Sequence, residues 1–450
     1  MSRIRIIITI IVVVLTTLLT GCTGKEPNEI AYVVALGIDS TDDDNYKITI
    51  QYANTTQISG GASESGGKAG SEIVDNVTIE APNIYAGVGL ANNIVSKSFS
   101  MSHAKLIVFS KEIAEKGVKD MIETLVRSEE IRPDVFIAVA NTTANDYLTS
   151  VNPEMEVNPA QYYQLIYQKN QLVGIPDGQL REFFTGLYTD NYDSILPVAG
   201  VIEGAGGNSQ NDDKGQSKDG QNEGSEGSSE SLDSFESKSS DDKDENEKEK
   251  DAEKNTSKYE YDIKNYVGGE TAIEKKNKAE AIGAAVFEKD KMVGEIGEVE
   301  TEICKILKGD YTYSYLTYYN NDTPDIPITV KTTQQKKPKY KIDTDKKTVD
   351  IELYIESDLY SLPADYNVEN KIEDFERDVA NYTSSACTEF INNFTKKYNS
   401  DILKLNEKVK YKFLTNNQYN WFKKNVGWSE YKFSVCTNFK VRRTGLIVRE

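Results

Sequence analysis

The stretch YKIDTDKKTVDIELYIE, residues 340–356, shows most clearly which fold class the second half of the chain adopts. Apolar residues alternate with polar ones from Val349 to Ile355, which is the two-residue period of a strand with one buried face. The charged run before them, residues 343–347, is typical of a turn. We therefore predict a β-hairpin over residues 340–356.

A long amphipathic helix is expected next, over about residues 366–398. Its apolar residues recur at spacings of three and four, which is the helical period: Ile372, Phe375, Val379, Tyr382, Ala386, Phe390 and Phe394. A further alternating segment, residues 431–441, predicts a strand near the end of the chain. Residues 259–450 are thus expected to form an α+β domain in which the long helix lies across an antiparallel or mixed sheet.

Strand and helix patterns alternate in the first half of the chain, residues 22–202. Strands are expected at 33–38, 46–52, 103–109 and 135–140, and helices at 82–95 and 111–126. In the second of these strands, Lys47, Thr49 and Gln51 are expected on a face that solvent covers. The fold class expected for the whole chain is α+β or mixed α/β, with several domains whose sheets are covered by helices.

The composition changes sharply between residues 203 and 258. From residue 204 to residue 257 there are 16 acidic and 7 basic side chains and almost no large apolar ones. Such a segment buries too little surface to offset the entropy of ordering it, so we predict a disordered acidic linker or insertion. Calcium binding by Asp241, Asp242 and Asp244 is the less favoured interpretation, because the glycine and distal glutamate of an EF-hand loop are missing.

The amino terminus resembles a secretion signal. Arg3 and Arg5 precede an apolar stretch, residues 6–19, which small residues follow. The apolar stretch is 14 residues long, whereas crossing the hydrocarbon region of a bilayer takes roughly 20 residues. A cleaved signal peptide over residues 1–21 is therefore favoured over a permanent transmembrane helix.

Leu19-Thr20-Gly21-Cys22 fits a bacterial lipobox, in which a cysteine thiol receives diacylglycerol before a peptidase cuts in front of it. We expect Cys22 to be the lipid-attachment residue and the first residue of a mature chain that lies outside the cytoplasmic membrane. The alternative is ordinary secretion with a chance cysteine. Each buried CH₂ contributes about 0.8 kcal/mol, so two or three acyl chains hold a soluble domain durably on a bilayer.

The net charge of the chain is strongly negative. The 52 basic and 72 acidic residues give −20, which becomes −22 when Arg3 and Arg5 are lost with the signal peptide. A surface of this sign repels a phosphate backbone, so no nucleic-acid partner is expected. Anionic lipid should likewise repel the body of the protein, which leaves the anchor at Cys22 to hold it at the membrane.

Few residues are available for catalysis or for metal binding. The chain has a single histidine, His103, and it contains no HExxH, CxxC, GxSxG or dinucleotide-binding motif. Residues 61–69 resemble a phosphate loop but lack glycine at position 62 and serine or threonine at position 69. His103 lies at the start of an expected strand and is interpreted as structural. No enzyme activity, cofactor or metal is expected, and no catalytic residue is assigned.

Three cysteines, Cys304, Cys387 and Cys436, are left once Cys22 is lipidated. At most one disulfide can join them within the chain. Cys436 is expected on the polar face of its strand, and Cys387 beside the apolar stripe of the long helix. A disulfide and buried free thiols are both open interpretations here.

Short motifs spread along the chain together resemble the Ger(x)C lipoproteins, the C subunits of the nutrient germinant receptors of endospore-forming bacteria. The resemblance covers nearly the whole mature chain and depends on the order and spacing of the motifs. They are the lipobox ending at Cys22, Glu29-Ile30-Ala31, Ala35-Leu36-Gly37-Ile38-Asp39, Ser102-His103-Ala104-Lys105, Ala114 with Gly117, Arg127 with Glu130-Ile131-Arg132, Gly283-Ala284-Ala285-Val286-Phe287 with Lys291, Val293 and Gly294, then Lys396, Asp401, Trp428 and Arg442-Arg443-Thr444-Gly445-Leu446. The chain departs from the family in having Thr23-Gly24 where Trp-Asp is common, and in its acidic segment.

The resemblance implies a protein that acts without catalysis. It implies about three α/β domains, with the first half dividing near residue 157. It also implies a lipid-anchored subunit on the outer face of the inner (cytoplasmic) membrane of the spore, with integral-membrane A and B subunits as partners in the response to small nutrients. His103, Asp401 and Trp428 match family positions, and each is interpreted as structural.

Three functions are consistent with the sequence. The favoured one is the receptor subunit, which works by protein–protein contact in spore germination. The second is a solute-binding lipoprotein of a transporter, which predicts saturable ligand binding. The third is an envelope glycan hydrolase, which predicts a pair of catalytic carboxylates, and no pair is nominated among the 72 acidic residues.

Overall fold

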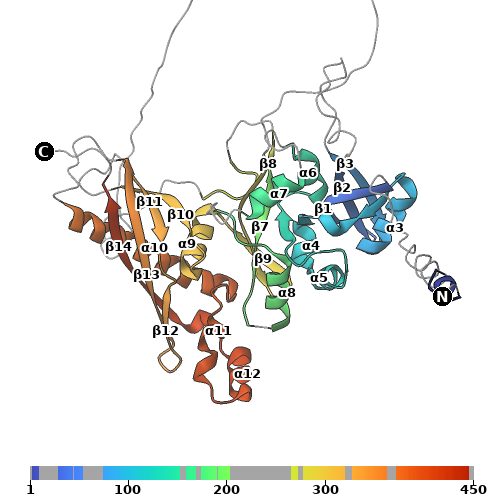
Figure 1. Ribbon diagram of the computed structural model, residues 1–450. Coiled ribbons are helices and arrows are strands. Elements are labelled where there is room, and N and C mark those ends of the chain that lie inside the picture. Colours follow the sequence, from blue (N-terminus) through green and yellow to red (C-terminus); the bar gives the residue numbers. More distant parts are fainter. Residues whose placement is uncertain are drawn as a thin grey trace, which may run out of the picture. The chain divides into compact units, whose positions relative to one another are not determined.

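The computed structural model describes residues 3–9, 29–43, 45–53, 74–152, 159–168, 174–189, 191–202, 265–271, 277–319, 327–361 and 371–444 (Figure 1). Residues 3–9 of the expected signal peptide form a short exposed helix. Cys22, residues 61–69 and the acidic segment expected at 203–258 lie outside the described residues. Within the described ranges, no helix combines the length and the apolar content that crossing a bilayer requires.

The first sheet has nine strands and is parallel at its centre (Figure 1). β1, β5, β6 and β7 pair in parallel, and the outer strands β2, β3, β8 and β9 pair antiparallel. The spatial order is β3 (Val74–Ala81), β2 (Tyr46–Ala53), β1 (Ile30–Ser40), β5 (Leu106–Ser110), β6 (Phe136–Ala140), β7 (Ile195–Val201), β8 (Ala279–Glu288) and β9 (Lys291–Ile296), while β4 (Ser98–Ser100) pairs with β1.

Helices cover both faces of this sheet, so every residue of its strands β5 and β6 is buried, and all of them except Ser110 are apolar. Ile107 and Phe109 of β5 belong to one buried cluster, and Leu106 and Val108 belong to another, as the alternation of a strand requires. The first cluster includes residues from α3 (Ile84–Ile94), α4 (Lys111–Lys116), α5 (Lys119–Val126) and α8 (Leu180–Thr189), and the second from α6 (Ala144–Ser150) and α7 (Pro159–Gln168). The mixed α/β class with helix-covered sheets is confirmed.

The expectation that one face of residues 46–52 is solvated is wrong. Thr49 and Gln51 are fully buried, and only Lys47 of the three polar residues is exposed. The α6 helix covers this face: Gln51 Nε2 donates to the Leu148 carbonyl at 2.9 Å, and Tyr163 of α7 donates to Gln51 Oε1 at 2.6 Å. Polar side chains can occupy a buried face when each finds a hydrogen-bond partner.

The single helix expected over residues 111–126 is broken in two at Gly117. Gly117 has φ of 123°, a conformation that side chains with a Cβ rarely adopt, and it ends α4 before α5 begins. The expected strand 103–109 also begins later, because residues 101–103 form a turn of 3₁₀ helix. His103 therefore lies outside the strand and is exposed.

The two strands that follow the acidic segment complete the first sheet. β8 pairs with β7, which precedes the acidic segment in the sequence, and β9 pairs with β8. The expected regions 22–202 and 259–450 thus both contribute strands to one sheet. Residues 268 and 269 cross close over Gly200, and Asn141 Nδ2 donates to the Gly268 carbonyl at 2.6 Å.

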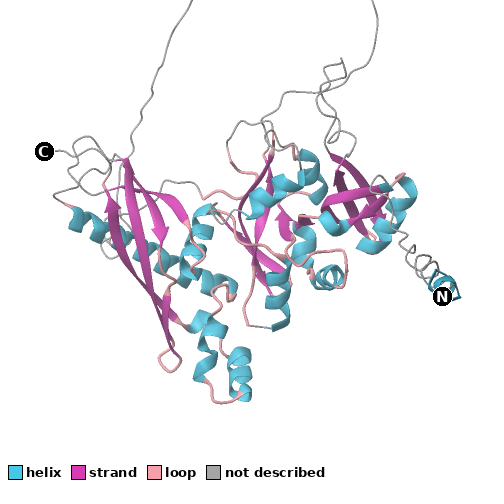
Figure 2. Cartoon of the chain, viewed as in Figure 1, coloured by secondary structure: helices cyan, strands magenta, loops and turns pink. Residues whose placement is uncertain are grey.

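The second sheet has five strands, drawn in magenta like the first in Figure 2. The predicted hairpin is confirmed as β12 and β13, which pair antiparallel, and β14 pairs with β13 in parallel. The sheet is therefore mixed. Its spatial order is β10 (Tyr313–Tyr319), β11 (Pro327–Gln334), β13 (Thr348–Ser361) and β12 (Lys339–Asp343), with β14 (Lys432–Arg443) on β13.

The predicted long helix is α10 (Ile372–Tyr398), and it lies along the open edge of β14. Side chains four residues apart on α10 accept hydrogen bonds from alternate peptide N–H groups of β14: Asn392 from Phe433, Thr388 from Val435 and Ser384 from Thr437, at 3.1, 3.0 and 2.9 Å. Four helical residues advance about 6 Å and two strand residues about 6.7 Å, so the two periods match. The helix thereby covers an edge that would otherwise be open to pairing with another chain.

Thr388→Val is expected to lower the free energy of unfolding by about 1–3 kcal/mol. The substitution keeps the shape of the side chain but leaves the buried Val435 N–H without its acceptor. Ser385→Ala, on the exposed side of the same helix, is the matched control and should change stability little. Urea unfolding of the two variants tests this, and equal stability of Thr388→Val and the parent chain would contradict the edge-covering role.

The three described cysteines are free thiols. Cys304 of α9 (Glu298–Lys308) and Cys387 of α10 are buried, and Cys436 of β14 is exposed. Burial raises the pKa of Cys387 to about 12 and raises the pKa of Cys304 as well. Cys387 lies within the apolar stripe of α10 rather than beside it, and both buried thiols act as small apolar residues.

Candidate functional site

Asp193 joins the first sheet to the loop that follows α10. Asp193 lies two residues before β7, and its carboxylate accepts the peptide N–H of Lys289 at 2.9 Å and that of Asp401 at 2.8 Å. The Asp193 N–H donates in turn to the Asp401 carbonyl at 3.1 Å. Lys289 is in the turn between β8 and β9 with φ of 58°. One side chain thus ties three segments together, and we call this arrangement the Asp193–Asp401 junction.

Asp401 holds the start of α11 (Leu405–Val409). Its two carboxylate oxygens accept the N–H groups of Leu405 and Asn406, both at 2.8 Å. The residue is 4% exposed. Burial raises the pKa of Asp401 to about 7, although the two peptide N–H groups and Lys408 favour the carboxylate and Asp193 opposes it. A carboxyl group that titrates near neutral pH therefore lies at the centre of the junction.

The junction is expected to be more stable at pH 5 than at pH 8. Because the folded pKa of Asp401 lies above its ordinary value of 3.8, its stabilising contribution is complete below that value and is lost as pH rises through about 7. The stability of the parent chain relative to Asp401→Asn should increase by about 2 kcal/mol between pH 8 and pH 5. Urea unfolding at several pH values measures this difference.

Asp343→Asn is the control for this titration. Peptide N–H groups of the 343–346 turn lower the pKa of Asp343, so its contribution changes only below its ordinary value and stays constant from pH 5 to pH 8. The difference in free energy of unfolding between the parent chain and Asp401→Asn should change over this range. If that difference is as constant as the one for Asp343→Asn, Asp401 does not titrate between pH 5 and pH 8.

The end of α10 packs on the β8–β9 hairpin beside the junction. Tyr398 donates to the Glu295 carbonyl at 3.1 Å, and Ser400 donates to the Phe287 carbonyl at 3.0 Å. Gly294 makes room for this contact, since a Cβ there would lie 2.3 Å from the Tyr398 ring. The first sheet and the α10 region are therefore in direct contact at several points.

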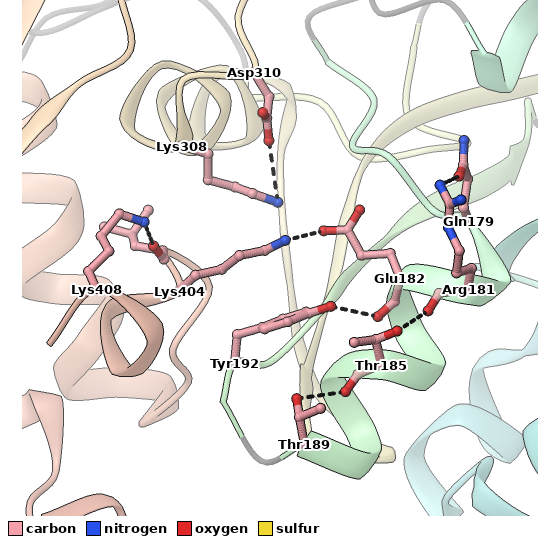
Figure 3. A network of polar contacts seen from close by, with 11 residues as sticks. Gln179, Arg181, Glu182, Thr185, Thr189, Tyr192, Lys308, Asp310, Lys404 and Lys408 are labelled. Carbon is pink, nitrogen blue, oxygen red and sulfur yellow. Dashed lines mark hydrogen bonds and ion pairs between the residues drawn. The ribbon is translucent and has the colours of Figure 1, made fainter. Parts of the chain in front are cut away.

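A second polar network extends the contact to α8 (Figure 3). Lys404 donates to Glu182 of α8 at 2.7 Å, and its ammonium group lies 4.3 Å from the centre of the Tyr192 ring. Tyr192 donates to the Glu182 carbonyl at 3.0 Å. Burial opposes ionisation of Glu182, but Lys308 and the bond from Lys404 outweigh it, so the pKa of Glu182 is lowered.

A cleft of about 690 Å³ opens beside the junction. Its lining is mainly polar and includes Asp193, Lys289, Asn399, Asp401, Asn406 and Trp428. Trp428 is 5% exposed, and its ring N–H donates to Asn406 Oδ1 at 3.1 Å. The carboxylate oxygens of Asp193 and Asp401 already accept peptide N–H bonds, so these groups hold the backbone together and are poorly placed to take a proton from a substrate.

The structure brings together two of the residues that the sequence singled out. Asp401 and Trp428 both line the cleft. His103 lies elsewhere, where its ring contacts the Tyr32 ring at 4.7 Å and its Nδ1 is 3.0 Å from Ser102 Oγ. Cys22, the expected lipid-attachment residue, is outside the described residues. Among the residues that are described, no group of three His, Cys, Asp or Glu side chains is arranged to hold a metal ion.

Sequence reasoning missed Asp193, Glu182 and Lys404. None of them belongs to a sequence motif, and the partners are more than 200 positions apart for Asp193 with Asp401 and for Glu182 with Lys404. No local pattern signals such a pairing. Among the residues at these contacts, Phe287, Gly294 and Asp401 stood in the family motifs.

Comparison with known proteins identifies the family. Residues 24–201 match the family model described as the spore germination protein N-terminal domain, and residues 282–445 match that of the spore germination B3/GerAC-like C-terminal domain. The chain belongs to the Ger(x)C family of spore germination proteins. Asp193 lies in the first matched region and Asp401 in the second, so the Asp193–Asp401 junction connects the two regions of a Ger(x)C chain.

Curated Ger(x)C relatives come from Bacillus subtilis (strain 168). Spore germination protein KC is 26% identical over 176 residues, which is 36% of this chain and 43% of that protein. Spore germination protein B3 is 26% identical over 148 residues, 31% of this chain and 36% of that protein. The matched region therefore spans less than half the length of these relatives. The crystal structure of the GerBC protein aligns with a TM-score of 0.48 and 15% identity, covering 90% of this chain and 96% of that one.

Proposed function

We propose that this chain is the lipid-anchored C subunit of a spore nutrient germinant receptor and lies on the outer face of the inner spore membrane. The observation that carries the proposal is the match of two spore germination domains, in order, over residues 24–201 and 282–445. The lipobox-like sequence ends at Cys22, directly before the first matched region, which supports an anchor at that end. Integral-membrane A and B subunits are the proposed partners.

The proposed mechanism is coupling through protein–protein contact. An anchor at Cys22 confines the chain to two dimensions and so raises its effective concentration near the membrane subunits. The Asp193–Asp401 junction and the Glu182–Lys404 pair hold the two matched regions against each other. When a partner displaces one matched region, the hydrogen bonds of the junction and the Glu182–Lys404 pair transmit the displacement to the other region.

The cleft favours a second candidate, a solute-binding lipoprotein of a transporter. Its volume of about 690 Å³ lies in the range of small-molecule sites. Saturable binding of a small solute by the full chain, lost on substitution of Asn399 in the cleft lining, would support this candidate. The cleft does not favour the glycan hydrolase, which would need two carboxylates that can exchange a proton with a substrate. The carboxylate oxygens of Asp193 and Asp401 accept hydrogen bonds from peptide N–H groups instead.

Deletion of the gene and complementation with the intact gene test the receptor proposal. Spores without the chain should lose the response to at least one class of nutrient and still germinate with a trigger that bypasses nutrient receptors. Complementation should restore the nutrient response. Unchanged germination with every nutrient mixture, together with a defect in solute uptake, would contradict the receptor role and favour the transporter.

A further inference from the structure

The segment from 410 to 425 differs in charge from the rest of the chain. It includes residues 410–412 and α12 (Asn416–Asn425), and we call it the α12 tip (Figure 1). It holds four lysines and no acidic residue, and no acidic residue occurs between Glu407 and Glu430. In a chain whose net charge is −20, this is a local concentration of positive charge.

The α12 tip also exposes large apolar side chains. Leu414, Tyr411 and Trp421 are 95%, 78% and 64% exposed. Leu414 directly precedes the Thr415 cap of α12, a position where an apolar residue commonly packs on the first turn of the helix. Phe413 takes that place, with its ring 5.9 Å from Tyr419 and 5.0 Å from Phe422, so Leu414 is left in solvent.

The inner face of α12 is well packed, so the exposure of Trp421 does not come from a loose helix. Tyr419 and Phe422 are buried, and Phe422 lies 5.8 Å from the ring of Trp428. Asn417, Trp421 and Lys424 follow at spacings of four and three and share the outer face. The α12 tip is therefore an ordered element that presents apolar and cationic side chains outward.

Three of the four lysines contact protein groups, and all of them except Lys423 are exposed. Lys412 donates to the Ile342 carbonyl near Asp343, and Lys423 donates to Asn191 Oδ1 at 3.2 Å. Lys410 and Lys424 are exposed; the Lys410 ammonium group lies 5.8 Å from the centre of the Tyr419 ring, and Lys424 lies at the lining of the cleft. Exposed tryptophan, tyrosine and leucine flanked by exposed lysines form the composition that suits the interface of a bilayer, where rings lie at the headgroups and ammonium groups meet lipid phosphates.

We propose that the α12 tip is a second, non-covalent membrane contact that binds the surface of an anionic bilayer. Leu414 and Trp421 enter the headgroup region, and Lys410 and Lys424 bind lipid phosphates. This contact is independent of the receptor role and of lipid attachment at Cys22. This proposal differs from the expectation that anionic lipid repels the body of the protein, because the charge of the α12 tip is opposite to that of the chain.

Vesicle binding by the full mature chain carrying Cys22→Ala tests the proposal without the anchor. The chain should co-sediment with vesicles of equal parts phosphatidylglycerol and phosphatidylcholine and fail to do so with phosphatidylcholine alone. Trp421 and Trp428 are the only tryptophans, and Trp428 is buried. The emission of Trp421 should therefore shift to shorter wavelength on binding, and Trp421→Phe should abolish the shift.

Paired variants distinguish the α12 tip from general adhesion. Leu414→Ser with Trp421→Ser, and Lys410→Glu with Lys424→Glu, should each weaken vesicle binding at least about tenfold, since one lysine near an anionic surface accounts for about fivefold. Ile94→Ser and Lys119→Glu, exposed residues outside the α12 tip, are the matched controls and should bind as the parent chain does.

Absence of binding to the anionic vesicles would overturn the proposal, as would equal loss in the controls. A second pair of results would also overturn the proposal: the parent chain does not bind vesicles, and the α12 tip variants lose proteins that co-purify with the parent chain. The α12 tip would then be assigned to a protein partner. Unfolding curves of all variants establish that each one is folded.

Discussion

Cys22→Ala is expected to release the chain from the spore membrane fraction almost completely. Cys22 is the only residue of the lipobox-like sequence whose thiol can accept diacylglycerol. Losing two or three acyl chains removes most of the affinity for the bilayer, because each buried CH₂ contributes about 0.8 kcal/mol. The measurement is immunoblotting of washed membrane and soluble fractions, with germination scored in the same spores.

Cys436→Ala is the matched control for this experiment. Cys436 is an exposed free thiol on β14, so its loss should leave both membrane attachment and germination unchanged. A wash at about 1 M salt, where charges are screened beyond about 3 Å, removes the electrostatic contribution of the α12 tip. A Cys22→Ala chain of mature length that stays with the membrane after this wash would contradict lipid anchoring at Cys22.

Gly200→Ala is expected to destabilise the fold by about 3 kcal/mol or more. A Cβ at this position in β7 would lie 2.0 Å from the Gly268 carbonyl carbon and from the Gly269 nitrogen. Overpacking usually costs about 1–3 kcal/mol, and here the obstacle is backbone, which cannot turn aside as a side chain can. The segment would have to leave Gly200, and the bond from Asn141 to the Gly268 carbonyl would be lost. Urea unfolding of the full chain measures the effect.

Gly89→Ala is the control for the glycine substitution. Gly89 lies in α3, and a Cβ there meets no atom within 4 Å. Alanine in an exposed helix interior should stabilise the chain by about 0.5–1 kcal/mol. If Gly200→Ala proves as stable as the parent chain, the backbone of residues 268 and 269 does not pack against Gly200 of β7 in the folded protein.

Elements with a clear apolar period were predictable from the sequence. The 340–356 hairpin and the helix at about 366–398 were found because alternation and three–four spacing each match one secondary structure. The break at Gly117 was missed because residues 111–126 keep the helical period while a single glycine takes a positive φ. The burial of Thr49 and Gln51 was missed because a strand shows which residues share a face but not what covers that face.

Contacts between distant segments could not be read from the sequence. Nothing in residues 279–296 indicates that β8 and β9 join the sheet of the first half, because β8 pairs with residues 78 to 91 positions away. The same limit applies to the Asp193–Asp401 junction. Asp401 and Trp428 were found through the family resemblance, whereas Asp193 carried no motif. Their meeting at one cleft is known only from the three-dimensional arrangement.

Affinity purification of the lipidated protein from detergent-solubilised spore membranes tests the central proposal most directly. The tag should be placed so that Cys22 stays free for lipid attachment, and the Cys22→Ala chain serves as the control for adsorption to the resin. Our account predicts recovery of two multi-pass membrane proteins, the A and B subunits, with the lipidated chain. Recovery of a transporter permease, or of no membrane protein from a well-solubilised sample, would contradict it.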